Sequence, residues 1–440
     1  MIEKTFVKRS GPKFWGWILF LVALIGIGFA AYMYQMVNGF QVTGMSRDIS
    51  WGLYIGHLTF FVGVAAGGVM IVLPYYFHDA KAYGRITVIG EFLAIAAIIM
   101  ALLFVLVDVG VPTKLLNVYL YWTPKSMLCW DSVVLPTYLI LNIVVGYQVL
   151  QAENKGLHYK KWVKVLAMIS VPVAFSIHIV TAFLYSGLPS RHYFLTAVLP
   201  AKFLASAFAT GPALIILICL LLKKLTGFDA GEKAIKMLST TAIYAYIATM
   251  IMMAGEFFTA YYSNVEAHKV ALTYLFAGYH GHNEFVPLMM VFVVCVIATL
   301  VLMIPTKFRY KKSTMIVGCI TLFLSMYIEK GLTFIIGGLS ENPFGEIVDY
   351  IPGPIEIAVI IGVFAIGFLI LSVLLKMVVV VKYDNDEAAF VNRPDRANLA
   401  YRLNEEAGTY VDTRPQPEPE VEEEAEEEAS DEAAPKGADA

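Results

Sequence analysis

Long apolar runs recur along almost the whole chain and restrict it to one class of fold. Each run has about eighteen or more residues with few charges, enough to cross the roughly 30 Å hydrocarbon core of a bilayer. Of the 440 residues, 58% are hydrophobic and 15% are charged, against about 45–50% and 25% in soluble domains. A water-soluble fold is therefore excluded, and the sequence predicts an all-α integral membrane protein with ten transmembrane helices. The predicted spans are residues 14–37, 51–77, 86–109, 130–150, 162–185, 200–222, 239–262, 284–304, 314–337 and 354–381.

Basic residues between the spans predict the orientation, because short cytoplasmic loops carry an excess of Lys and Arg. Eighteen basic residues fall on the side that holds both termini. Six fall on the opposite side, namely Arg47, Lys114, Lys125, Arg191, Lys202 and Lys269. We therefore expect a multi-pass protein of the cytoplasmic (inner) membrane with both termini in the cytoplasm. Its surroundings are then membrane lipid, and no nucleic acid is expected as a partner.

The C-terminal region differs in composition from the membrane domain, which we assign to residues 1–382. Residues 415–440 contain nine Glu, two Asp and one Lys. This segment has a net charge of −10 and almost nothing apolar to bury, which predicts an acidic disordered tail. A docking arm for a basic partner is the alternative. Residues 383–414 are then a cytoplasmic linker.

The cysteines lie too far apart to form the usual clustered cofactor sites. They are Cys129, Cys219, Cys295 and Cys319. Their spacing excludes a CxxC zinc site, a c-type haem attachment sequence and the cysteine clusters of iron–sulfur proteins. We therefore expect no metal site and no iron–sulfur cluster in this chain.

The second predicted span contains four glycines at helical spacing, Gly52, Gly56, Gly63 and Gly67. Separations of four, seven and four residues place them on one stripe of a helix as two GxxxG pairs. The stripe predicts close approach of another helix and carries no chemistry by itself.

Polar residues within the spans are costly and are therefore functional candidates. His57, Asp108, Asp131 and His178 all fall toward the side opposite the termini, at similar predicted depth. Tyr138 and Tyr185 each follow one of these residues by seven positions and so share its helix face. A pocket lined by imidazole, carboxylate and phenol suits a quinone, because quinone carbonyls need donors and quinol oxidation needs a base. Each residue could instead be a hydrogen-bonded core residue or a hydrated interfacial one.

A second set of charged residues suggests a route for protons. Glu91 belongs to the inner half of its span, whereas Glu256, Glu329 and Lys330 lie in outer halves. A transporter or ion-translocating subunit would use intramembrane charges in the same way. The remaining alternative for the histidines is one haem held between His57 and His178, which the sequence supports only weakly.

Two stretches resemble signature regions of the NrfD/PsrC family of membrane quinone-interacting subunits. They are WGLYIGHLTFFVGVAAGG at residues 51–68 and LPAKFLASAFATGPAL at residues 199–214. Ten spans resemble the long subgroup typified by DsrP of the sulfite-reduction-associated DsrMKJOP complex and by HmcC. The resemblance implies two four-helix bundles, at about 51–185 and 200–337, with one peripheral helix on each side.

The same resemblance implies what the chain does. It implies a menaquinone or menaquinol site near the outer membrane face, with His57 close to the family's quinone-side histidine. It further implies an extracytoplasmic ferredoxin-like iron–sulfur subunit as electron partner, cytochrome b and multihaem cytochrome c subunits in the same complex, and a link to sulfate respiration. We therefore expect a quinol-oxidising or quinone-reducing subunit that is not a complete enzyme alone, with a translocating subunit or a scaffold for a cytochrome as alternatives.

Overall fold

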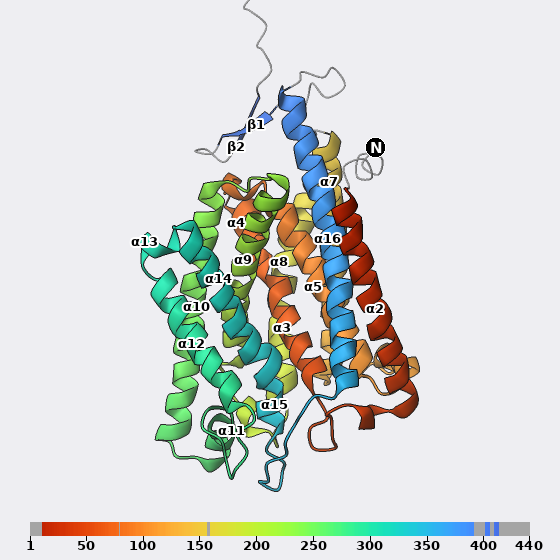
Figure 1. Cartoon of the computed structure of the whole chain (residues 1–440), viewed down its shortest axis with the longest axis vertical. Coiled ribbons are helices and arrows are strands. Elements are labelled where there is room, and N and C mark those ends of the chain that lie inside the picture. Colours follow the sequence, from red (N-terminus) through yellow and green to blue (C-terminus); the bar gives the residue numbers. More distant parts are fainter. Residues whose placement is uncertain (1–10, 79, 156–158, 391–400, 405–408, 413–440) are drawn as a thin grey trace, which may run out of the picture.

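A computed structural model describes residues 11–78, 80–155, 159–390, 401–404 and 409–412 (Figure 1). The described chain is an all-α integral membrane fold, and the ten predicted spans are confirmed as ten helical segments long and apolar enough to cross a bilayer. They are α2 (Pro12–Asn38), α3 with α4 (Leu53–Gly67 and Val69–Phe77), α5 (Thr87–Asp108), α7 (Met127–Lys155), α8 (Lys161–Ser186), α9 (Leu199–Thr226), α10 (Glu232–Tyr262), α12 (Val286–Met303), α14 (Lys312–Met326) extended by η5 (Tyr327–Thr333) and α15 (Phe334–Leu339), and α16 (Pro354–Phe390).

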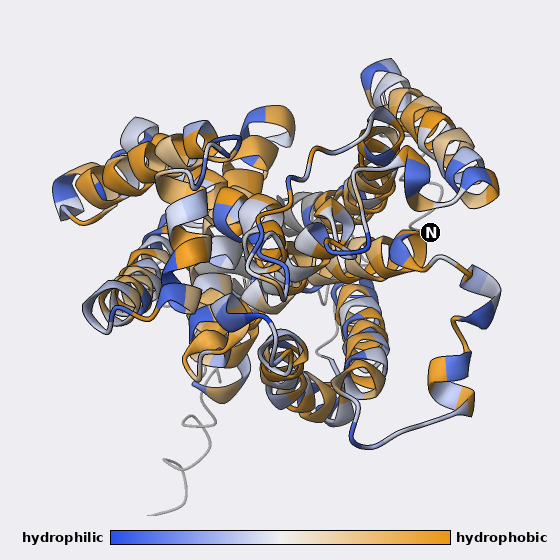
Figure 2. Ribbon diagram, turned by 90° about the horizontal axis from the view of Figure 1, so that it is seen from below, coloured by the Kyte–Doolittle hydropathy of each residue, from blue (hydrophilic) through white to orange (hydrophobic). Residues whose placement is uncertain are grey.

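Short elements connect the spans and distinguish the two ends of the molecule. We call the end at which α2 begins and α16 ends the terminal face, and the opposite end the loop face (Figure 1). The short helices are η1 (Phe40–Val42), η2 (Lys81–Tyr83), η3 (Pro112–Lys114), α6 (Asn117–Leu120), η4 (His192–Phe194), α11 (Glu266–Phe276) and α13 (Thr306–Arg309). Figure 2 looks at the loop face, with hydrophobic residues along the spans and many hydrophilic ones in the connections.

The segment after the membrane domain is not a plain linker. α16 continues to Phe390, and strands β1 (Tyr401–Asn404) and β2 (Thr409–Asp412) pair antiparallel. The acidic segment 415–440 lies outside the described residues.

The α3 helix occupies the centre of the molecule. It packs against α5 and α8 of its own bundle and against α9 and η5 of the second bundle. Every residue of α3 after Leu53 is buried, which explains why its sequence is apolar on all sides rather than on one stripe.

The glycine stripe of this helix brings the two bundles together. A Cβ atom at Gly67 would lie 2.3 Å from the Cα of Gly211 in α9, and one at Gly56 would lie 2.3 Å from the carbonyl oxygen of Gly331 in η5. A Cβ at Gly63 would have nothing within 4 Å. The predicted close approach is therefore confirmed at Gly56 and Gly67, whereas Gly63 does not take part.

The first and last spans are arranged differently from the prediction. They do not flank the bundles on opposite sides, because α2 and α16 pack against each other and α16 also contacts α5 and α7 (Figure 1). Gly28 and Gly362 allow this pairing, since a Cβ at Gly28 would lie 2.5 Å from the Cα of Gly362. The resulting helix pair covers one side of the first bundle.

Candidate functional site

His57 lies in the second turn of α3 near the loop face, and only 1% of its surface is exposed. Its Nδ1 is 2.6 Å from the carbonyl oxygen of Leu53 and its Nε2 is 2.7 Å from the hydroxyl of Tyr327. Because a carbonyl can only accept, Nδ1 carries the proton of the neutral ring, and the Tyr327 hydroxyl then donates to Nε2. Both ring nitrogens are thus engaged in hydrogen bonds.

Aromatic side chains enclose this imidazole. The ring of Phe104 stacks on it at 5.0 Å, and that of Phe364 meets it edge-on at 5.3 Å. Tyr327 is only partly buried, in contrast to His57. Any proton that reaches Nε2 therefore has the Tyr327 hydroxyl as its nearest exchangeable neighbour.

A hydrogen-bond network on the loop face continues from the same turn of α3. The amide of Leu53 donates to the Tyr350 hydroxyl over 2.9 Å, and Tyr350 donates to Glu356 in the first turn of α16. The amide of Gly44 donates to the other oxygen of this carboxylate over 2.9 Å. These bonds satisfy an N–H at the start of α3 that lacks an intrahelical partner, and they connect α16 to the backbone that orients His57.

Asp108 is the last residue of α5 and lies near the hydrogen-bonded side chains of Tyr54 and Gln35. Tyr54 donates to Gln35 over 2.6 Å, and Gln35 donates to the carbonyl oxygen of Val107 over 2.9 Å. Asp108 Oδ1 is buried and has no hydrogen-bond partner among the described residues. A buried carboxylate oxygen without a donor is costly, and this one marks a place where a ligand hydroxyl or a water would be stabilised.

Asp131 and Tyr185 belong to another group, on the opposite side of α3. Thr181 donates to Asp131 over 2.8 Å, and the hydroxyls of Tyr185 and Thr59 are 2.5 Å apart. Thr59 and His57 are two residues apart on one helix and therefore point in nearly opposite directions. The α3 helix separates the two groups.

The side chains of Tyr138 and His178 both hydrogen-bond to backbone carbonyl oxygens. The Tyr138 hydroxyl donates to the carbonyl oxygen of Ala65 over 3.4 Å, and His178 Nδ1 is 3.2 Å from that of Ala174. His178 Nε2 is buried without a partner among the described residues. Within the residues that the structure describes, no hydrogen bond joins any two of the six predicted quinone-site residues. They therefore do not form a single hydrogen-bonded cluster. The six are His57, Asp108, Asp131, Tyr138, His178 and Tyr185.

Three of the four predicted proton-path residues meet in the second bundle around Lys202. Its Nζ is 2.7 Å from Glu256 and 3.3 Å from Glu329. Lys330 donates to the carbonyl oxygen of Phe203 over 3.2 Å, and its Nζ lies 4.1 Å from the centre of that residue's ring. Glu329 and Lys330 belong to η5, a seven-residue π-helix, and such segments are frequently found at functional sites.

Lys202 falls within the predicted span 200–222 and is also counted among the basic residues of the side opposite the termini. It is the fourth residue of α9, and only 3% of its surface is exposed. Its side chain is buried in the bundle, where the carboxylates of Glu256 and Glu329 compensate its charge. Glu91, by contrast, is isolated in α5, and neither carboxylate oxygen has a hydrogen-bond partner in the described chain.

One group of side chains within the described ranges has the composition of a metal site. The ligand atoms of His282, Glu284 and Asp349 lie within 4.8 Å of one another on the loop face. His282 Nδ1 hydrogen-bonds Asp349 at 2.8 Å, and Glu284 and Asp349 are exposed. Exposed acidic groups of this kind are common without a metal ion, so the grouping alone does not indicate one.

Similarity to known proteins agrees with this architecture. The family model for polysulphide reductase NrfD matches residues 41–339. A putative dimethyl sulfoxide reductase membrane subunit of Halobacterium salinarum is 24% identical over 87% of this chain and 95% of its own length.

Two other relatives match shorter stretches. A selenate reductase subunit of Mesobacillus selenatarsenatis is 23% identical over 59% of this chain and 68% of its own length. The Hdr-like menaquinol oxidoreductase integral membrane subunit of Archaeoglobus fulgidus is 24% identical over 49% of this chain and 52% of its own length. Since the family model covers more than half of the sequence, this chain belongs to the polysulphide reductase NrfD family.

Proposed function

We propose that this chain is the quinone-interacting membrane subunit of a respiratory redox complex. In this proposal menaquinol binds near the loop face, which lies outside the cytoplasm, and an extracytoplasmic iron–sulfur subunit takes its electrons. The names of two relatives support the redox class, since one is a selenate reductase subunit and one a menaquinol oxidoreductase subunit. The observation that carries the proposal is the buried His57–Tyr327 pair beside the acceptor-rich network at the end of α5.

The chemistry assigns different tasks to the groups around this pair. Oxidation of a quinol to a quinone releases two electrons and two protons. The electrons pass to the iron–sulfur partner, while the protons need bases within hydrogen-bond reach. In our assignment the proton acceptors are His57 and Asp108 on one side of α3 and Asp131 on the other. His57 receives its proton at Nε2 through the partly buried hydroxyl of Tyr327, which can donate or accept.

Further residues complete the proposed site. Tyr138, His178 and Tyr185 hold or border the quinone, and Nε2 of His178, which has no partner among the described residues, can accept a hydrogen bond from a quinol hydroxyl. Glu91, Glu256, Glu329 and Lys330 carry protons between the site and the membrane faces. The finer assignment to the ten-span DsrP-like subgroup, with sulfate respiration and cytochrome b and c partners, belongs to the same proposal.

A translocating subunit is the second candidate, favoured by the Lys202–Glu256–Glu329 cluster. Such a buried cluster is expensive unless its charges are paired, and it lies next to the π-helix. In that case solute or ion binding would respond to substitution of Lys202 and would not need a quinol.

The test is the substitution His57→Leu, which keeps the bulk of the side chain and removes both hydrogen-bonding nitrogens. We expect turnover with a quinol analogue to fall by roughly 10²–10⁴ if His57 is a proton acceptor. The abundance of the protein in membranes should stay near normal, because Gly56 and Gly67 and not His57 set the helix approach. Full turnover at normal abundance would remove His57 from the site, and loss of abundance would make it a packing residue.

A further inference from the structure

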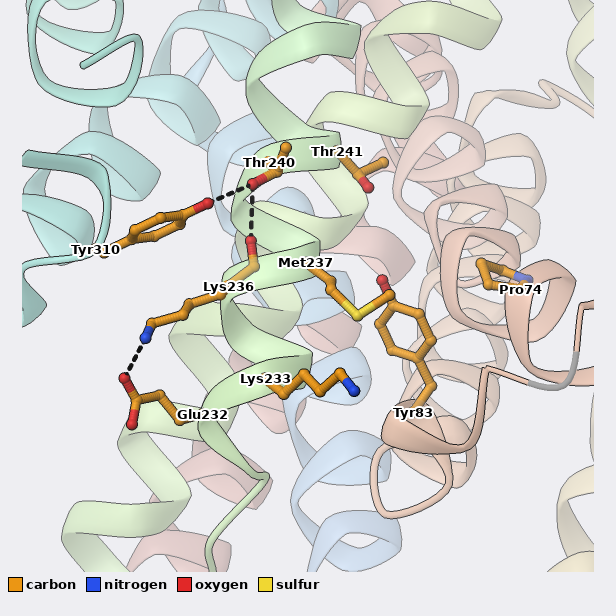
Figure 3. A pocket seen from close by; sticks show the side chains of 9 residues that line it. All are labelled: Pro74, Tyr83, Glu232, Lys233, Lys236, Met237, Thr240, Thr241 and Tyr310. Atoms are coloured by element: carbon orange, nitrogen blue, oxygen red, sulfur yellow. Dashed lines mark hydrogen bonds and ion pairs between the residues drawn. The ribbon is translucent and has the colours of Figure 1, made fainter. Parts of the chain in front are cut away.

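A groove of about 830 Å³ opens on the terminal face (Figure 3). Its size is within the range typical of ligand sites. One wall is the first part of α10 in the second bundle, and the other is formed by Pro74 of α4 and Tyr83 of η2 in the first bundle. Tyr310, which follows α13, borders the groove beside α10. The groove therefore lies at the seam between the two bundles.

Polarity changes in steps along the α10 wall. Lys233 and Lys236 occupy its first turns, and Thr240 and Thr241 follow about 6–12 Å further along, at 1.5 Å per residue. Tyr244, the next residue on this side of the helix, is 65% exposed within a membrane span. Met237 lies between the lysines and the threonines, so the α10 wall combines ammonium groups, an apolar side chain and hydroxyls.

The polar end of the groove is positively charged. Figure 3 shows Lys233 extended toward the side of Tyr83, and Lys236 directed toward Glu232. The Lys236–Glu232 pair is 2.6 Å long, but the two side chains are 45% and 76% exposed, and such pairs are weak and exchange readily. Around Tyr310, hydrogen bonds with Thr240 and with Arg309 lower the pKa of the phenol, as expected where donors and cations surround an oxygen.

We propose that this groove binds an anionic glycerophospholipid from the membrane leaflet on the terminal face. The phosphate lies at Lys233 and Lys236, and the glycerol esters and the start of an acyl chain lie against Met237, Thr241 and Pro74. Charge complementarity selects an anionic headgroup, because basic grooves between membrane helices attract such lipids. The bound lipid fills the seam and contacts both bundles.

The test compares lipids on the complex purified in detergent. Phosphatidylglycerol should raise its melting temperature in a saturable manner, and phosphatidylcholine should not. The double substitution Lys233→Gln and Lys236→Gln should weaken the phosphatidylglycerol affinity roughly 10- to 30-fold. Each lysine near an anionic headgroup adds a similar share of the binding free energy, and both shares are lost. The matched control is Lys160→Gln with Lys161→Gln, two exposed lysines elsewhere on the terminal face, which should bind phosphatidylglycerol as the unsubstituted protein does.

A second variant tests the apolar part of the groove. Met237→Trp keeps both lysines and fills the space for the acyl chain, so it should also weaken phosphatidylglycerol binding. Equal stabilisation by phosphatidylcholine, or an unchanged affinity in the double variant, would overturn the proposal. Saturation by inorganic phosphate alone, at the same affinity, would make this a phosphate site and would overturn it equally.

Discussion

At the scale of single residues, the donor and acceptor pattern around His57 explains how a buried imidazole can exchange a proton. Neutral His57 donates from Nδ1 to the carbonyl oxygen of Leu53 and accepts at Nε2 from Tyr327. When Nε2 gains a proton it becomes a donor, and the Tyr327 hydroxyl must turn and accept. The two states therefore differ by one hydroxyl rotation, without movement of a helix.

This pattern predicts that Tyr327→Phe impairs quinol-linked turnover. The variant keeps the aromatic ring and leaves Nε2 of His57 buried without a partner, which costs about 1–3 kcal/mol. We expect turnover to fall and its pH profile to shift relative to the unsubstituted protein, because protonated His57 would lose its acceptor. Tyr261→Phe is a suitable control, since Tyr261 is exposed and its hydroxyl hydrogen-bonds the Thr273 hydroxyl in α11. An unchanged pH profile at normal abundance would exclude Tyr327 from the proton route.

The residue scale also shows where prediction from sequence ends. His57 and its depth follow from the hydropathy and the loop charges. Its partner Tyr327 does not, because 270 residues separate the two and only tertiary packing brings η5 against α3. Lys202 falls within a predicted span, but the sequence does not show what compensates its charge there. Two carboxylates, from α10 and η5, stabilise it inside the bundle, and single-sequence periodicity cannot pair them.

At the scale of elements, the close approach of α3 and α9 sets the distance between the bundles. Apolar run length was sufficient to predict all ten spans, and glycine spacing was sufficient to predict a contact face on α3. Neither could identify the facing helix. Gly67 meets Gly211 of α9, whereas Gly63 faces open space, although both occupy the same predicted stripe. The pairing of α2 with α16 was missed for the same reason, because partner choice depends on both surfaces.

These two glycines give a matched test of the interface. We expect Gly67→Ala to lower the thermal stability of the purified protein, because a Cβ 2.3 Å from the Cα of Gly211 forces two backbones apart. Overpacking of this kind typically lowers the free energy of unfolding by about 1–3 kcal/mol, and we expect a loss of this size for Gly67→Ala. Gly63→Ala has room for its methyl group and should be neutral or slightly stabilising, since alanine favours a helix over glycine. Equal effects of the two substitutions on the melting temperature would contradict the observed contact.

At the scale of the whole molecule, an even number of spans places both ends of the membrane domain at the terminal face (Figure 1). The lysines of the α10 groove, the Glu153–Lys382 ion pair and the basic segment around α13 also lie toward this face. The polar networks of His57, Tyr350 and Glu356 lie toward the loop face. The molecule therefore has one cation-rich end and one end with buried hydrogen-bonding groups.

Which face is cytoplasmic follows from the same asymmetry and can be measured. Because Lys and Arg are retained on the cytoplasmic side, a reporter fused after Lys382 should be active in the cytoplasm, and one inserted between Phe344 and Gly345 should be active outside it. The second position is a suitable insertion site, since Phe344 is 80% exposed and Gly345 has a positive φ in a turn. The control inserts the same reporters between Thr226 and Gly227, at the terminal-face end of α9, and should match the Lys382 fusion. If the 344–345 insertion reported the cytoplasm, the proposed quinol site would face inward, and an extracytoplasmic iron–sulfur subunit could not receive its electrons.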